Sequence, residues 1–272
     1  MTRHVYIIQG TMITKQQLDS IRFYMGDEEI TNQMLGGPKA YNTINALLSS
    51  GFFDEVNKVK ENRVLEIVNT QHLKQYLQNI VDILLAMEEF VKEKKLPLVT
   101  YRIDRYASLE ALQQTKQLEG FYSTCTYGYL PQYAHIKKDV VLFEIHREED
   151  VPYVDFETLF DHYAKKEEAE LLLPPKAKVT LIEEVALSEK EKMLYYDMDH
   201  KEPVGKFRIH IAKPCYPCNN TYDVITSDES VKKLQECLQV FMKQENLSKE
   251  QELFYLDWKQ QVLEYLGFCL KK

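Results

Sequence analysis

The sequence predicts an α+β protein with a helical N-terminal part, a mixed or antiparallel β-sandwich-like core, and a helical C-terminal tail. Three observations lead to this fold class. The first hundred residues carry helix signals, residues 98–211 hold several short strand-like runs, and helical periodicity returns near residue 227. Because the strand-like runs do not alternate regularly with helices, a doubly wound parallel sheet is disfavoured.

Helices are expected first, in a lobe over residues 1–96. Thr14 can cap a helix, and Gly26 can end it. A second helix is predicted over 39–48. The clearest helix covers about 69–95, where apolar residues recur in steps of three and four. That spacing puts them on one face, so this helix should pack on the core of its own domain.

The β core is predicted from short runs rich in β-branched and apolar residues. These runs are 98–106, 140–145, 171–173, 179–182 and 204–211. In the tail, Ser227 or Asp228 can cap one amphipathic helix and Ser248 another. The expected organisation is a domain over 1–213, with a helical lobe (1–96) and a β core (97–213), followed by a helical extension (214–272).

Composition narrows the classes of protein that this chain can belong to. The chain has 272 residues, 44% of them apolar and 28% charged, which is typical of a globular protein. Its formal net charge is −8 and its basic residues are not clustered, so nucleic-acid binding is not favoured. No signal peptide or membrane span is expected. We expect synthesis in the cytoplasm, with export or delivery that needs no cleaved signal left open.

The five cysteines do not suggest a disulfide framework, because their number is odd and they are scattered. Cys215 and Cys218 form a C-x-x-C pair. A structural zinc site needs four ligands, and no second pair supplies the others. We therefore expect no metal.

An arginine in the first strand-like run is a candidate for binding phosphate. Arg102 follows Tyr101 directly. A guanidinium can hold a diphosphate through two parallel hydrogen bonds. The alternative is an ion pair with a nearby carboxylate, Asp104 or Glu144, and Arg102 taken alone favours that alternative.

Two further segments carry hydroxyl and carboxylate groups. Ser123 and Thr124 can hydrogen-bond a ribose or orient a carboxylate, although they also fit an ordinary strand. Glu168 and Glu170 are two residues apart, so in an extended segment they point to one face and repel each other. The alternative for this acidic run is a solvated loop.

Taken in order, these segments resemble the Arg/Ser/Glu class of ADP-ribosyltransferases, and in particular bacterial exotoxin-type mono-ADP-ribosyltransferases. That class has an arginine on its first core strand, a Ser-Thr-Ser strand, and a Glu-x-Glu before a later strand. The run 41–48, Tyr-Asn-Thr-Ile-Asn-Ala-Leu-Leu, resembles the helix that exotoxin members carry upstream. The resemblance covers roughly 35–183. It departs from the family at Cys125, where the third serine of the middle motif would stand.

The resemblance implies a role for each matched residue, with NAD+ as the substrate. Arg102, with Tyr101, would bind NAD+, and Ser123 and Thr124 would contact the ribose. Ser123 would also support the catalytic carboxylate. That carboxylate is assigned to Glu170, because it directly precedes Leu-Leu-Leu-Pro, and Glu168 would activate the acceptor.

The implied activity is transfer of ADP-ribose from NAD+ to a protein, with arginine as the acceptor because a glutamate stands at 168. The alternatives are NAD+ glycohydrolysis with water as the acceptor, ADP-ribosylation of a nucleic acid, and an inactive interaction module with this fold. The expected partners are a protein substrate and a neutralising or delivery partner, for which the helical tail is a candidate docking segment.

Overall fold

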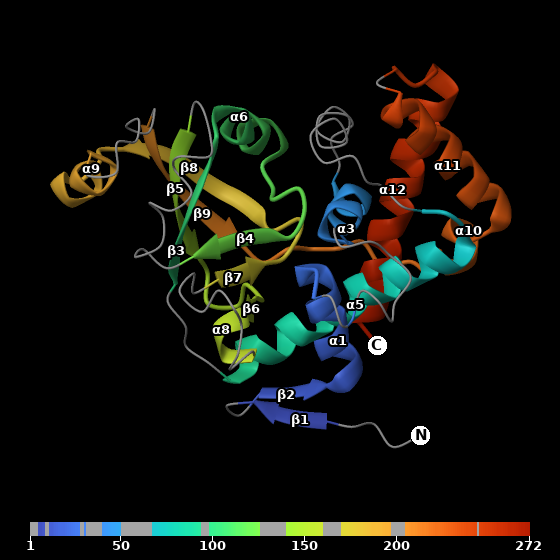
Figure 1. The fold of residues 1–272 in the computed structure, drawn as a ribbon, viewed down its shortest axis with the longest axis horizontal. Coiled ribbons are helices and arrows are strands. Elements are labelled where there is room, and N and C mark those ends of the chain that lie inside the picture. Colours follow the sequence, from blue (N-terminus) through green and yellow to red (C-terminus); the bar gives the residue numbers. More distant parts are fainter. Residues whose placement is uncertain are drawn as a thin grey trace. The chain divides into compact units, whose positions relative to one another are not determined.

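The computed structural model describes residues 5–8, 11–27, 30, 40–49, 67–93, 98–125, 140–159, 170–196, 205–243 and 245–272 (Figure 1). The chain groups into two compact units. The first unit comprises Met1–Ile7, Met12–Ala86 and Cys215–Lys272, and the second comprises Ile8–Thr11 and Met87–Pro214. Compactness thus groups the C-terminal segment with the N-terminal helices. The division into a domain over 1–213 and a helical extension over 214–272 stays a prediction.

The first unit is mainly helical, and α1 begins and ends at the signals that the sequence predicts. Its N-terminal helices are α1 (Lys15–Met25), α3 (Ala40–Leu48) and α5 (Thr70–Glu93), whose last residues belong to the second unit. Thr14 accepts a hydrogen bond from the Gln17 amide and Gly26 ends α1 at a φ of 79°, so both predicted caps of α1 are confirmed. Pro38 and Lys39 lie outside the described residues.

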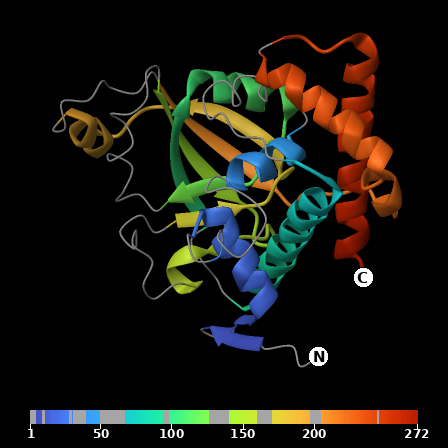
Figure 2. The same cartoon turned by 45° about the vertical axis from the view of Figure 1, so that its right-hand side comes forward.

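The C-terminal segment of the first unit holds α10 (Tyr222–Ile225), α11 (Asp228–Met242) and α12 (Lys249–Leu270). Ser227 caps α11 and Ser248 caps α12, as expected. Helices α11 and α12 lie side by side in both views (Figures 1 and 2). The buried Lys259 ammonium donates to the carbonyl of Ser49, 2.6 Å away. This bond joins the last helix to the end of α3.

The second unit is built on one mixed sheet of seven strands in the order β6-β7-β4-β3-β5-β9-β8. The strands are β3 (Val99–Arg105), β4 (Tyr122–Cys125), β5 (Val140–Arg147), β6 (Val154–Asp155), β7 (Glu170–Leu173), β8 (Lys178–Val185) and β9 (Gly205–Ala212). Among these described strands, only β5 and β9 pair in parallel. A separate two-stranded sheet joins β1 (Val5–Ile8) to β2 (Thr11–Thr14). The α+β class is confirmed, whereas the described strands form one large sheet where a sandwich was expected.

The sheet has a junction at its centre. Strand β3 pairs with β5 along its whole length, and β4 pairs with β7 along all of Tyr122–Cys125. Between these two ladders, the recorded register of β3 with β4 is one pair, Tyr101 opposite Cys125. In Figure 1, β4 and β7 lie across the direction of β3. The two strands therefore diverge from this pair, and the segments singled out in the sequence meet there.

Two helices of the second unit were not predicted, α6 (Tyr106–Thr115) and α9 (Glu189–Tyr196). A short helix, α8 (Phe156–Leu159), begins at Phe156, where the apolar residues have helical spacing. Helix α6 follows β3 directly, with no side chain capping its first turn, and it ends at Lys116 in the left-handed region, with a φ of 54°. The usual sequence signals of a helix, an N-cap hydroxyl and a terminal glycine, are thus missing. Helix α9 does carry a signal, because the Ser188 hydroxyl accepts from the Glu191 amide.

Candidate active site

The structure brings the three predicted segments together at the β3–β4 junction. Tyr101 on β3 lies opposite Cys125 on β4, and Cys125 lies opposite Glu170 on β7. Leu171, Leu172 and Leu173 are buried and fix β7 in the sheet. Because strand pairing sets these neighbours, Arg102 and Ser123 also lie beside the junction. The sequence order Arg, Ser, Glu becomes adjacency across three strands.

Ser123 and Glu170 are in direct contact. The Ser123 hydroxyl donates to Glu170 Oε1 at 2.5 Å, which is a short, charge-assisted hydrogen bond when the carboxylate is ionised. Thr124 instead points into the protein, where its hydroxyl donates to the Leu171 carbonyl at 2.9 Å, and it is buried. Ser123 thus holds a carboxylate, while Thr124 secures the pairing of β4 with β7.

Arg102 reaches the same serine from the other side of the junction. Its Nη1 donates to the Ser123 carbonyl at 2.7 Å, and its Nε donates to Asp104 Oδ2, also at 2.7 Å. The ion pair with Asp104, considered as an alternative from the sequence, is therefore present. The guanidinium also lies over the ring of Tyr122, with 4.3 Å from Cζ to the ring centroid. Arg102 is thus held beside the Ser123–Glu170 pair by its neighbours.

The sequence reading missed Tyr122. Its hydroxyl donates to Asp104 Oδ2 at 3.3 Å. Burial, and next the Asp104 carboxylate, raise the pKa of Tyr122 well above its ordinary value, so its phenol stays protonated. The signal available in the sequence was an aromatic residue directly before Ser123.

Tyr101 and Cys125 occupy the junction pair itself. The Cys125 thiol lies 3.6 Å from the Tyr101 carbonyl, to which it donates. Burial raises the pKa of Tyr101, and the nearby Glu144 raises it further. Cys125 is almost fully buried, so the thiol that replaces the third serine of the family motif makes a backbone contact here.

Three residues that the sequence analysis singled out are not among the described contacts at the β3–β4 junction. Glu168 lies outside the described residues. Tyr41 and Asn45, in the segment that resembles the upstream exotoxin helix, belong to the first unit, where Asn45 donates to the Tyr24 hydroxyl at 3.2 Å. The part of the chain that the structure describes holds no group of three or more metal-ligating side chains. None of its described helices is long and apolar enough to cross a membrane.

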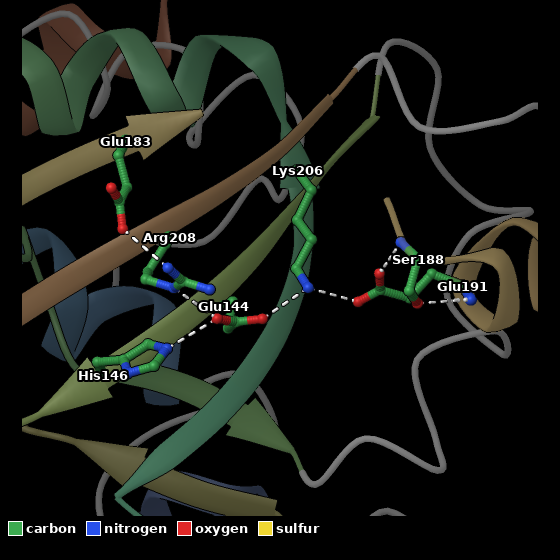
Figure 3. A network of polar contacts seen from close by, with 7 residues as sticks. All are labelled: Glu144, His146, Glu183, Ser188, Glu191, Lys206 and Arg208. Atoms are coloured by element: carbon green, nitrogen blue, oxygen red, sulfur yellow. Dashed lines mark hydrogen bonds and ion pairs between the residues drawn. The ribbon is translucent and has the colours of Figure 1, made fainter. Parts of the chain in front are cut away.

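A second polar cluster, which we call the Glu144 network, borders Tyr101 across β3 and β5 (Figure 3). The Glu144 carboxylate accepts from Lys206 at 2.6 Å and contacts Arg208 and His146 at 2.8 Å. Lys206 also bonds Glu191 on α9 at 2.6 Å. Burial alone would raise the pKa of Glu144, but its hydrogen bonds with Lys206, His146 and Arg208 outweigh burial and hold the pKa at about 2.

The Glu144 network predicts a loss of stability in acid. A carboxylate whose pKa is lowered on folding stabilises the protein above its unfolded pKa, and this contribution disappears as the pH falls toward the folded value. For Glu144 the window extends from about pH 4.5 down to about pH 2, and screening by solvent limits the loss to about 2 kcal/mol. Thermal unfolding from pH 6 to pH 2.5 measures it. A Glu144→Gln protein should show a flatter profile, and identical profiles would contradict the assignment.

Comparisons with known proteins find similarity at the level of solved structures. No family model matches the sequence, and no curated protein matches it. The ADP-ribosyltransferase Vis in complex with agmatine is 17% identical, with 74% of each chain covered and a TM-score of 0.39. An ADP-ribosyltransferase from Clostridium botulinum is 15% identical, with 74% of this chain and 88% of that chain covered and a TM-score of 0.38. The ADP-ribosyltransferase HopU1 of Pseudomonas syringae is 16% identical, with 78% and 99% covered and a TM-score of 0.33.

Proposed function

We propose that this chain is a mono-ADP-ribosyltransferase that cleaves NAD+ and transfers ADP-ribose to an arginine of a protein. One observation carries the proposal: the Ser123 hydroxyl holds the Glu170 carboxylate at 2.5 Å, while Arg102 bonds the carbonyl of the same serine. A fixed carboxylate beside a fixed guanidinium suits a substrate with a cationic reacting end and a diphosphate. NAD+ has both features.

In the proposed reaction, Glu170 stabilises the charge that develops on the ribose. The bond between ribose C1′ and the nicotinamide nitrogen breaks, and its electron pair leaves with nicotinamide. Positive charge then spreads over C1′ and the ring oxygen, where a preorganised carboxylate is most effective. The Glu170 carboxylate accepts a hydrogen bond from the ribose 2′-hydroxyl, and Ser123 keeps that carboxylate in place.

Arg102 serves the other end of the substrate. Its guanidinium binds the diphosphate, for which a planar group with several donors is well suited. Tyr101, at the junction pair, contributes to the same binding region, and so does the Ser123–Thr124 strand. The Thr124 hydroxyl is bound to the Leu171 carbonyl, so Thr124 contributes by holding β4 against β7.

We propose Glu168 as the general base for the acceptor. An arginine nitrogen attacks C1′, forms the new bond and gives its proton to Glu168, which stands two residues before Glu170. Glu168→Gln is therefore expected to reduce transfer to protein by about 10²-fold, while NAD+ hydrolysis falls far less. The ratio of protein-bound label to released nicotinamide measures this. Equal loss of the two activities would refute the acceptor role.

The test of the proposed function uses NAD+ labelled separately in its adenylate and nicotinamide parts, incubated with the purified protein and a cell lysate. Release of labelled nicotinamide together with adenylate label on protein supports the proposal, and mass spectrometry then identifies the modified residue. Label that is sensitive to nuclease would favour a nucleic-acid acceptor. Nicotinamide release without any transfer would leave a glycohydrolase. No release at all would leave an inactive interaction module.

The proposed activity also implies partners. An enzyme that consumes NAD+ or modifies arginines endangers the cell that makes it, so we propose a neutralising or delivery partner that docks on α11 and α12. The proposal includes synthesis in the cytoplasm and export by a route without a cleaved signal. Co-purification of the tagged chain from its native host tests the partner, and failure to recover a stoichiometric partner would count against it.

A further inference from the structure

We infer that Tyr122 is a positioning residue that presets the plane of the Arg102 guanidinium for the diphosphate of NAD+. This inference rests on the proposed function. It assigns a role to a residue for which the sequence motif suggests none, and it rests on the contact between the Tyr122 ring and the Arg102 guanidinium.

Three contacts hold the Arg102 guanidinium in place. Asp104 holds Nε and the Ser123 carbonyl holds Nη1, each at 2.7 Å. The third constraint is the Tyr122 ring, which lies 4.3 Å from Cζ. The two hydrogen bonds orient the guanidinium, and the Tyr122 ring beneath Cζ opposes its rotation toward that side.

Tyr122 and Asp104 are themselves joined, because the Tyr122 hydroxyl donates to the same Asp104 oxygen that binds Arg102. The Asp104 side chain is only 12% exposed, and that of Arg102 is 28% exposed. The ring comes from β4 and the carboxylate from β3, so the contacts around Arg102 join these two strands. Its geometry depends on the single register pair at Tyr101 and Cys125.

A guanidinium whose plane is already fixed loses less conformational entropy when it binds a phosphate in two parallel hydrogen bonds. Because Arg102 would contact the diphosphate before and during bond cleavage alike, its positioning affects substrate binding and leaves the chemical step unchanged. Loss of the Tyr122 ring should therefore raise the KM for NAD+ and leave kcat nearly constant.

The experiment compares Tyr122→Leu with Tyr122→Phe by steady-state NAD+ hydrolysis and by calorimetric binding of ADP-ribose, which carries the diphosphate without nicotinamide. Tyr122→Leu is expected to weaken both about 5- to 20-fold, as loss of stacking and preorganisation implies. Tyr122→Phe keeps the ring and should remain within about threefold of the wild type. Unchanged affinity in a folded Tyr122→Leu protein, or a fall in kcat at constant KM, would overturn the inference.

Two further comparisons separate positioning from general structural loss. Tyr153 lies under Arg147 in the same way, with 4.4 Å from Cζ to its ring centroid, and is buried in the same unit. Tyr153→Leu should lower the melting temperature without changing the affinity of the folded protein for ADP-ribose. In an Arg102→Ala background, Tyr122→Leu should have no further effect, since coupled residues are not additive. Additive losses would overturn the inference.

The wild-type protein separates this inference from the proposed function. If wild type neither binds ADP-ribose nor releases nicotinamide, the proposed function fails, and the role of Tyr122 fails with it. If wild type is active and the two Tyr122 variants behave alike, the inference alone fails. If Tyr122→Leu does not fold, Asp104→Ala removes the acceptor that Arg102 Nε and the Tyr122 hydroxyl share, and it should weaken ADP-ribose binding several-fold at constant kcat.

Discussion

Replacing Glu170 with glutamine is expected to reduce nicotinamide release by about 10²- to 10³-fold, the size of effect seen when one preorganised electrostatic group is removed from an active site. Glutamine has nearly the same shape, and its carbonyl oxygen can still accept the hydrogen bond from the Ser123 hydroxyl. What disappears is the negative charge near the developing cation. Release of nicotinamide from NAD+, measured under saturating substrate, gives the loss in kcat.

A matched control separates the charge of Glu170 from the general effect of removing a carboxylate. Glu184 also lies on a strand of the same sheet but is exposed on β8. Glu184→Gln should leave nicotinamide release within about twofold of wild type, since exposed substitutions away from special features have small effects. Both variants should melt within a few degrees of the wild type. Full activity of the Glu170→Gln protein would refute the assignment of the catalytic carboxylate.

Replacing Glu144 with glutamine is expected to destabilise the folded protein by about 3 kcal/mol, because the buried Lys206 loses one of its two carboxylate partners. Glu144 is only 7% exposed, and it receives both Lys206 and Arg208. Glu191 still binds Lys206 in the variant, which limits the loss. Urea unfolding followed by circular dichroism measures the difference.

Glu183 is a matched control for Glu144, because both carboxylates bind Arg208. Glu183 binds Arg208 at 3.0 Å, but its side chain is 41% exposed. Exposed ion pairs contribute little, so Glu183→Gln should lower stability by less than about 1 kcal/mol. If the two variants are equally destabilised, burial is not what makes the Glu144 network important.

Local signals at a helix end, or apolar periodicity along the helix, made the predicted helices visible in the sequence. Thr14 and Gly26 bound α1, and Ser248 begins α12 with a reciprocal bond to Gln251. Helix α6 was missed because Arg105 offers no cap and Lys116, where a glycine is usual, ends it. The grouping of α12 with α3 depends on Lys259 and Ser49, a contact that periodicity cannot reveal.

The proximity of Arg102, Ser123 and Glu170 was predictable from the motif order, whereas their individual contacts were not. The motif order placed Ser123 near Glu170, and strand pairing brings the two into contact. It did not indicate that Arg102 would bond a backbone carbonyl and lie over the ring of Tyr122, because these contacts depend on how β3 and β4 pair. The pairing of β4 with β7 likewise turned the Thr124 hydroxyl toward a carbonyl.

The bond between Lys259 and Ser49 also has a consequence for how the protein is made. These residues are 210 positions apart, and the unit that contains both also uses the last helix of the chain. A ribosome releases the whole of residues 87–214 before it releases that helix. The β unit therefore has all of its residues outside the ribosome first, while α3 awaits a helix that is synthesised much later. Since domains generally fold as units during synthesis, we expect the described part of the candidate active site to form before α3 packs against α12.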